Sequence, residues 1–140
     1  TMGDFRPLDL ASTAWAFAAL PSSDAPLLQA IAASSQRKLP EFGPQDLGNL
    51  AWSMACMPVD DAPLLEAIAS AAQTQLPIGK TPPQALANMA WAFATLGFEH
   101  PPLMAAIAAP SLASMPQFGE QDLSNLVWAL ATRRCADRPL

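Results

Sequence analysis

The stretch FGPQDLGNLAWSMA, residues 42–55, contains the pattern that the rest of the chain repeats. Similar letters surround each of four tryptophans: LASTAWAFA around Trp15, LGNLAWSMA around Trp52, LANMAWAFA around Trp91 and LSNLVWALA around Trp128. Successive tryptophans are 37, 39 and 37 residues apart. Self-similarity at a period near 40 residues is typical of stacked helical repeats and of propellers.

A second shared string lies twelve residues after each of the first three tryptophans: LLQAIA from Leu27, LLEAIA from Leu64 and LMAAIA from Leu103. Apolar residues in both strings recur at helical intervals, which excludes the propeller. We predict an all-α fold, an α-solenoid of about 3.5 helical hairpin repeats of 37–39 residues. Residues 1–140 would form a single domain, with repeats at about 5–41, 42–77 and 78–117, a half repeat at 118–133 and a tail at 134–140.

Prolines and acidic residues mark where the helices begin. Proline is tolerated in a first helical turn, and an aspartate there is favoured by the helix dipole. We predict seven helices over residues 7–20, 24–38, 44–57, 61–75, 82–96, 101–114 and 120–133. Pro110 should kink or restart the sixth helix, because proline removes a backbone donor from the helix interior.

Helical geometry places each tryptophan beside two buried stripes, one of large apolar residues and one of small residues. Small side chains let a neighbouring helix approach closely, so the second stripe should meet the adjacent repeat. The indoles lie at its edge. We predict that they are structural core, acting as spacers between repeats: Trp15, Trp52, Trp91 and Trp128.

A narrow polar line remains on the first helix of each repeat. Its residues form the candidate binding face: Gln45, Asn49, Ser53, Gln84, Asn88, Thr95, Gln121, Asn125 and Thr132. Asn is unfavourable within a helix because its side chain competes for backbone hydrogen bonds. Two explanations stay open for the repeated Asn: hydrogen bonds to the backbone of a neighbouring repeat, or a ladder of amides that reads a ligand, as in one-base-per-repeat RNA-binding proteins.

Composition argues against several classes of function. The net charge is −5 with only seven Lys and Arg, so the chain lacks the basic field that attracts nucleic acid or anionic lipid. The one histidine, His100, lies at a helix start, and Cys56 has no histidine near it in sequence. No phosphate loop or metal-ligand spacing occurs. We expect no catalysis, no cofactor or metal, no small-molecule substrate and no transmembrane segment.

The pattern F-x-P-Q-D-L-x-N-x-x-W-x-x-A of residues 42–55, seen again around Trp128, resembles the octotricopeptide repeat. The second-helix entries DAP at residues 61–63 and HPP at residues 100–102 resemble that family's proline-rich start. The resemblance covers residues 5–133. It implies an α-solenoid in a chloroplast or mitochondrion, acting in organellar RNA maturation, stability or translation, or as a structural member of an organellar assembly.

Two functions therefore compete. The favoured one is a non-enzymatic docking or scaffold subunit of a large organellar assembly, such as a mitoribosome or photosynthetic complex, whose partner is another protein or multi-subunit complex. The helix predicted at 120–133 has no second helix to cover it, so Leu123, Leu126 and Leu130 form the candidate docking end. The alternative is a single-stranded RNA-binding factor, for which the cations are few and dispersed.

Overall fold

The computed structural model describes residues 4–19, 25–56, 61–76 and 80–136. Within these residues every regular element is helical: α1 (Pro7–Ala18), α2 (Ala25–Lys38), η2 (Leu39–Glu41), α3 (Pro44–Cys56), α4 (Ala62–Gln75), α5 (Pro83–Leu96), α6 (Pro101–Ser114), η3 (Met115–Gln117) and α7 (Glu120–Ala136). The prediction of an all-α fold is confirmed. None of the described helices combines the length and the hydropathy needed to cross a lipid bilayer.

Side chains cap the starts of two helices in the way that the sequence indicates. The carboxylate of Asp61 accepts a hydrogen bond of 3.0 Å from the backbone N–H of Leu64 at the start of α4. At the start of α6, Nδ1 of His100 accepts one of 3.1 Å from the N–H of Leu103. Nε2 of the same histidine lies 3.3 Å from Oε1 of Glu66, which ties α6 to α4. His100 is therefore a structural cap.

Helix α1 ends at Ala18 and not at the predicted residue 20, and the structure differs from the predicted elements in three further places. Helix α7 continues to Ala136, so residues 134–136 are helical and do not belong to a tail. The 3-10 helices η2 and η3 precede α3 and α7, and the repeat pattern did not predict them. Pro110 does not restart the sixth helix, because α6 runs unbroken through it. Pro110 is buried inside the helix.

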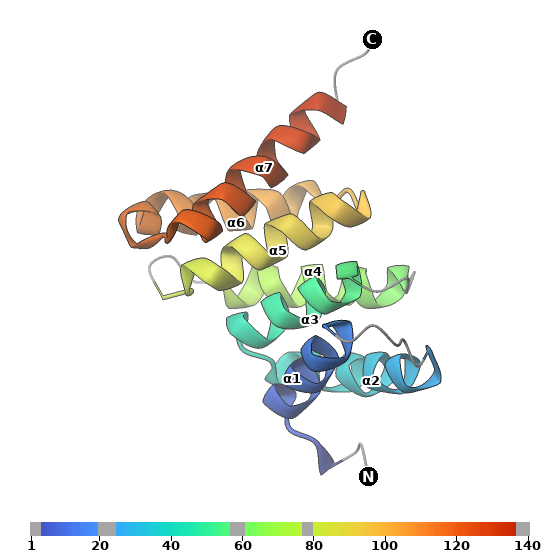
Figure 1. Ribbon diagram of the computed structural model, residues 1–140. Helices are drawn as coiled ribbons and strands as arrows, with labels where there is room; N and C mark the ends of the chain where they lie inside the picture. The colour runs from blue at the N-terminus through green and yellow to red at the C-terminus, as the bar shows by residue number, and fades with distance from the viewer. Residues whose placement is uncertain (1–3, 20–24, 57–60, 77–79, 137–140) are drawn as a thin grey trace.

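The helices form two layers (Figure 1). In one layer α3 packs between α1 and α5, and α5 packs between α3 and α7. In the other layer α4 contacts both α2 and α6. Each even-numbered helix also contacts the odd-numbered helix that precedes it in the chain. Successive helix pairs therefore follow one another from the N-terminal to the C-terminal end of the stack.

Helices α3 and α5 approach closely at Gly48. A β-carbon at Gly48 would lie 3.0 Å from the carbonyl oxygen of Ala85 and 3.1 Å from its Cα atom. The equivalent residues of the flanking odd helices, Ala11 and Ala87, are fully buried. Small residues are needed here because the backbone of the next helix occupies the space of a larger side chain.

Candidate functional site

Part of the predicted binding face meets in a pocket that spans three odd-numbered helices. The pocket has a volume of about 230 Å³ and is lined by Ser12, Trp15, Gln45, Asn49 and Gln84. Ser12 and Trp15 belong to α1, Gln45 and Asn49 to α3, and Gln84 to α5. We call it the amide pocket. Sequence reasoning placed the three amides on one line, but Ser12 and Trp15 were not among its candidate binding residues.

The other predicted binding-face residues do not line the amide pocket. Four of them are at least partly exposed: Asn88, Thr95, Gln121 and Asn125. The side chain of Thr132 lies outside the described residues. The prediction is wrong for Ser53, which is buried and donates a hydrogen bond of 2.7 Å to the carbonyl oxygen of Asn49. The residue that follows each tryptophan is buried in α3, α5 and α7 but exposed in α1, the first helix among the described residues. This position therefore packs against the preceding helix.

Pairs of amides on the same helix hold two of the three repeated Asn side chains. Nε2 of Gln45 donates to Oδ1 of Asn49 at 3.2 Å, and Nε2 of Gln121 donates to Oδ1 of Asn125 at 3.0 Å. Residues four apart face each other on a helix, so these bonds fit the geometry. The two Asn side chains are thus held by their own helix and not by the backbone of a neighbouring repeat.

The prediction that the tryptophans are core residues is wrong for two of them. Trp15 is 50% exposed and Trp128 is 47% exposed, while Trp52 and Trp91 are half-buried. The interface between odd helices admits only small side chains, as Gly48 shows, and an indole is too large for it. The indoles lie at the edge of that interface instead of inside it.

Three of these indoles form a row, which we call the indole ladder. The ring centroids of Trp15 and Trp52 are 6.1 Å apart, and those of Trp52 and Trp91 are 6.4 Å apart. Both pairs have an interplanar angle of 31°. Because Trp15 also lines the amide pocket, the ladder and the pocket form one continuous surface.

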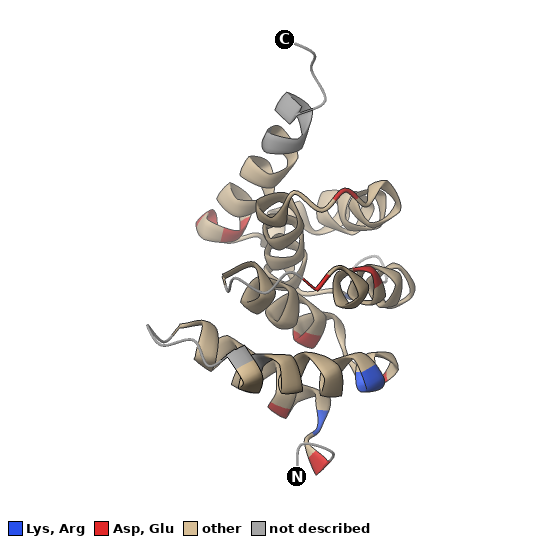
Figure 2. Cartoon of the chain, turned by 90° about the vertical axis from the view of Figure 1, so that its right-hand side faces the viewer, with Lys and Arg blue, Asp and Glu red and all other residues tan. Residues whose placement is uncertain are grey.

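Lys and Arg are sparse along the described helices (Figure 2). Helices α1, α3 and α5 contain no Lys or Arg, whereas Asp9 and Asp46 lie in the first turns of α1 and α3. A carboxylate in a first turn is stabilised by the helix dipole. The charges that these three helices carry are therefore negative.

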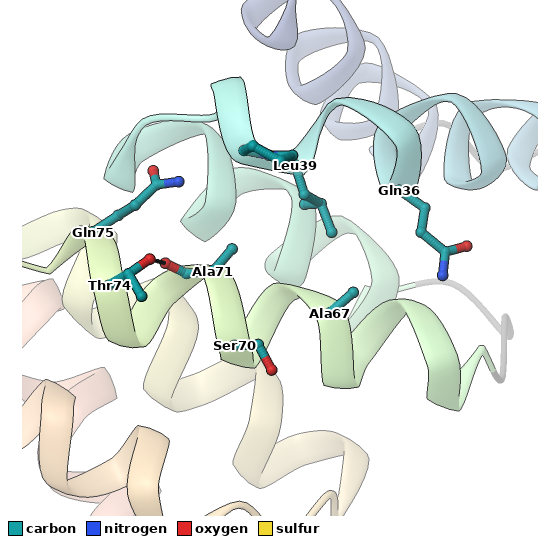
Figure 3. Close-up of a pocket in the computed structure, with 8 residues that line it drawn as sticks. Gln36, Leu39, Ala67, Ser70, Ala71, Thr74 and Gln75 are labelled. Atoms are coloured by element: carbon teal, nitrogen blue, oxygen red, sulfur yellow. Dashed lines mark hydrogen bonds between the residues drawn. The ribbon is translucent and has the colours of Figure 1, made fainter.

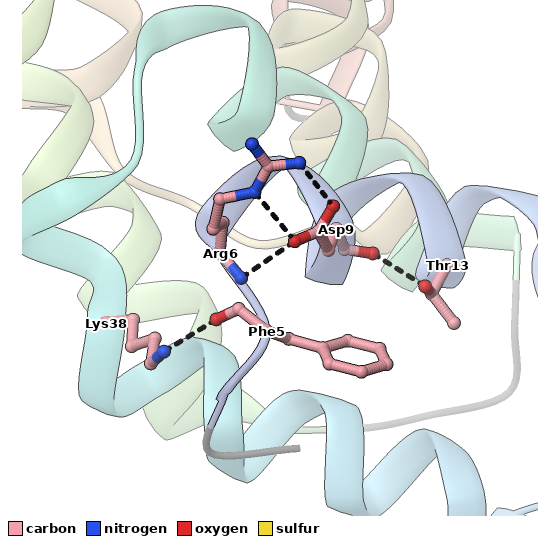
Figure 4. A network of polar contacts seen from close by, with 5 residues as sticks. All are labelled: Phe5, Arg6, Asp9, Thr13 and Lys38. Carbon is pink, nitrogen blue, oxygen red and sulfur yellow. Dashed lines mark hydrogen bonds and ion pairs between the residues drawn. The ribbon is translucent and has the colours of Figure 1, made fainter. Parts of the chain in front are cut away.

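Two described cations take part in local structure at the N-terminal end (Figure 4). Nε of Arg6 lies 3.0 Å from Oδ2 of Asp9, and the backbone N–H of Arg6 donates to the same oxygen. These side-chain and backbone hydrogen bonds lower the pKa of Asp9. Nζ of Lys38 donates to the carbonyl oxygen of Phe5 at 2.6 Å, joining α2 to the segment before α1. Neither cation lines the amide pocket.

Helix α7 carries the predicted docking end. Leu123 is 37% exposed and Leu130 is 39% exposed, but the prediction is wrong for Leu126, which is buried in the core. Val127, which sequence reasoning missed, is 57% exposed. The sequence did mark this position as different. The residue immediately before the tryptophan is Ala in the other three repeats, and only the fourth repeat has the larger Val there. We call Leu123, Val127 and Leu130 the α7 open surface.

In α3 and α5 the residues at the repeat positions of Leu123, Val127 and Leu130 are buried. They are Leu47, Ala51 and Met54 in α3 and Leu86, Ala90 and Phe93 in α5, and none of these side chains is more than 3% exposed. Helices α3 and α5 each have a following odd-numbered helix and a second helix of their own pair. Within the described residues α7 has neither, which explains its exposure.

A second hollow lies in the layer of even-numbered helices (Figure 3). Its volume is about 510 Å³, and it lies between α2, η2 and α4, with Leu39, Ala67 and Ala71 in its wall. The hydroxyl of Thr74 donates to the carbonyl oxygen of Ala71 and so is already satisfied. This hollow offers no charged side chain to orient a ligand.

The described residues contain no group of three His, Cys, Asp or Glu side chains that could hold a metal ion.

Cys56 is exposed, and partial desolvation raises the pKa of its thiol from the usual 9.0. Since the thiolate is the reactive form, a Cys135→Ser variant should be alkylated by iodoacetamide at pH 7.5 several-fold more slowly than free cysteine. The rate should climb as the pH rises past 9. Alkylation faster than that of free cysteine at pH 7.5 would instead reveal an activated nucleophile.

Comparisons with protein-family models, curated proteins and solved structures gave no match to this chain. The resemblance to octotricopeptide repeats therefore stays a prediction from the sequence, and function has to be argued from the surfaces described above.

Proposed function

We propose that this chain is an α-solenoid segment that acts as a non-enzymatic docking module for another protein. The observation that carries the proposal is the α7 open surface, whose three side chains are 37–57% exposed. Membership of a large organellar assembly is part of the proposal and rests on the octotricopeptide resemblance alone.

The chemistry of the α7 open surface favours an amphipathic helix as the partner. In α3 and α5 the equivalent positions are covered by other helices of the stack. Three neighbouring aliphatic side chains lose their remaining contact with water when a helix covers them. Because they are 37–57% exposed beforehand, each contributes only part of the roughly 1.5–3 kcal/mol that full burial gives. A helix with Leu and Ile on one face, as α4 has with Leu64, Leu65 and Ile68, supplies the matching surface.

A peptide copied from the chain itself tests this. Residues 61–76 include α4 with its Asp61 cap, and the peptide should bind the whole chain saturably, as measured by fluorescence anisotropy of a labelled copy. Val127→Asp should weaken binding at least tenfold, because docking would bury an unpaired carboxylate. The matched control is Gln121→Asp on the exposed polar side of α7, which should leave affinity unchanged within about twofold.

Equal affinity of the Val127→Asp and Gln121→Asp chains would place the peptide elsewhere and refute the docking proposal. So would a peptide with Leu65→Asp and Ile68→Asp that binds as well as the original.

Single-stranded RNA is the second candidate ligand, and the half-exposed indoles favour it because bases stack on aromatic rings. Against it stands the lack of Lys and Arg on α1, α3 and α5. Filter binding of an RNA oligonucleotide at 50 and 200 mM salt separates the two readings. An RNA-binding protein should lose affinity steeply with salt, whereas a docking module should show weak binding and little dependence.

A further inference from the structure

The amide pocket and the indole ladder form a second surface, built by α1, α3 and α5, that the docking proposal does not use. We propose that this surface binds an extended, basic polypeptide segment, with one arginine side chain seated in the amide pocket against Trp15. The proposal does not depend on the α7 open surface.

The lining of the pocket suits a guanidinium group. Ser12, Gln45, Asn49 and Gln84 bring one hydroxyl and three amide groups to the same space, and the half-exposed indole of Trp15 forms another part of the wall. Guanidinium carries five N–H donors in a plane and stacks on aromatic faces. Oδ1 of Asn49 accepts one hydrogen bond from Gln45, and a carbonyl oxygen has two lone pairs, so a second donor can be accommodated.

Charge selects a cationic ligand over an anionic one. Asp46 lies in the first turn of α3, Asp9 in that of α1 is paired with Arg6, none of the three helices contains Lys or Arg, and the whole chain has a net charge of −5. Phosphate recognition commonly relies on Arg or Lys, and the pocket side chains include no cation. Gln45 and Gln84 lie in the first turns of α3 and α5, and Asp46 places a carboxylate in the same turn of α3. An arginine enters a negative field and stacks on Trp, the best of the cation–π partners.

The spacing of the ladder suits an extended segment. Alternate residues of an extended strand point to the same side and are about 6.6 Å apart, which is two steps of about 3.3 Å. Centroid separations of 6.1 and 6.4 Å along the ladder are close to this value. Every second side chain of the bound segment can therefore meet one indole, beginning with Trp15 at the pocket.

The test uses a labelled peptide of four Arg-Gly repeats and the whole chain, with binding followed by fluorescence anisotropy at 150 mM salt. Trp15→Ala should weaken binding about tenfold, since it removes the stacking face of the pocket. Trp128→Ala is the matched control, because that indole is similarly exposed but does not line the pocket, and it should change affinity by less than about twofold. Gln84→Met, which keeps the side-chain length but removes the amide, should weaken binding several-fold.

Three results would overturn the proposal. Equal loss in the Trp15→Ala and Trp128→Ala chains would show that the pocket is not the site. A Lys-Gly peptide that binds as tightly as the Arg-Gly peptide would reduce the effect to general charge attraction. An RNA oligonucleotide that displaces the peptide with higher affinity would assign the surface to nucleic acid.

The Val127→Asp chain should bind the Arg-Gly peptide normally, so failure of the docking proposal and failure of this one are distinguishable.

Discussion

Replacing Leu86 by Ala is expected to lower the free energy of unfolding by about 3–4 kcal/mol. Leu86 lies in α5, is fully buried, and belongs to the helix that packs between α3 and α7. The loss combines the transfer of the missing carbon atoms with a cavity that the helices packed on both sides of α5 close only in part. Urea unfolding followed by circular dichroism measures the change.

Leu123→Ala is the control for this substitution, because Leu123 occupies the same repeat position in α7 and is 37% exposed. Its removal should cost about 1 kcal/mol or less, since much of the side chain already contacts water in the folded chain. A loss as large as that of Leu86→Ala would mean that α7 is covered on both sides. The idea of an open surface would then fail.

Gly48→Val is expected to lower the free energy of unfolding by about 2–3 kcal/mol. The new β-carbon would meet the carbonyl oxygen of Ala85 at 3.0 Å, and this neighbour is backbone and cannot rotate away. Helices α3 and α5 would have to separate, which disrupts packing along their whole contact. The higher helix propensity of Val relative to Gly offsets only a few tenths of a kcal/mol.

Ser124→Val controls for the size of the new side chain. Ser124 holds the repeat position of Gly48 in α7 and is exposed, so valine there should change stability by no more than about 0.5 kcal/mol. If Gly48→Val proves as harmless as Ser124→Val, then α3 and α5 do not approach each other as the structure indicates.

The helices were predictable because their signals are local. The sixth helix begins and ends at the predicted residues, 101 and 114, since a capping histidine and two prolines mark its start. The third begins at Pro44 as predicted, and its described part runs to Cys56. Caps, prolines and the apolar period all act within a turn or two, so a single sequence displays them completely.

Burial at the edge of a helix was not predictable in the same way. Trp15 and Ser53 both lie near the border between the predicted buried stripes and the polar line, yet Trp15 is exposed and Ser53 is buried. Whether such a border residue is buried depends on which side of its helix packs against the neighbouring repeat. The sequence of one helix does not contain that information. Leu126 was misplaced for the same reason. The amide pocket needs three helices in register, so it emerged only from the structure.

Hydrogen exchange of the backbone amides tests the central claim, that α7 presents a surface left open for a partner helix. In the isolated chain the amides of α5, which has neighbours on both sides, should exchange at least tenfold more slowly than those of α7. Adding the peptide of residues 61–76 should slow exchange in α7 and leave α1 unchanged. Amides of α7 that are as protected as those of α5 before any peptide is added, and that do not respond to it, would contradict the claim.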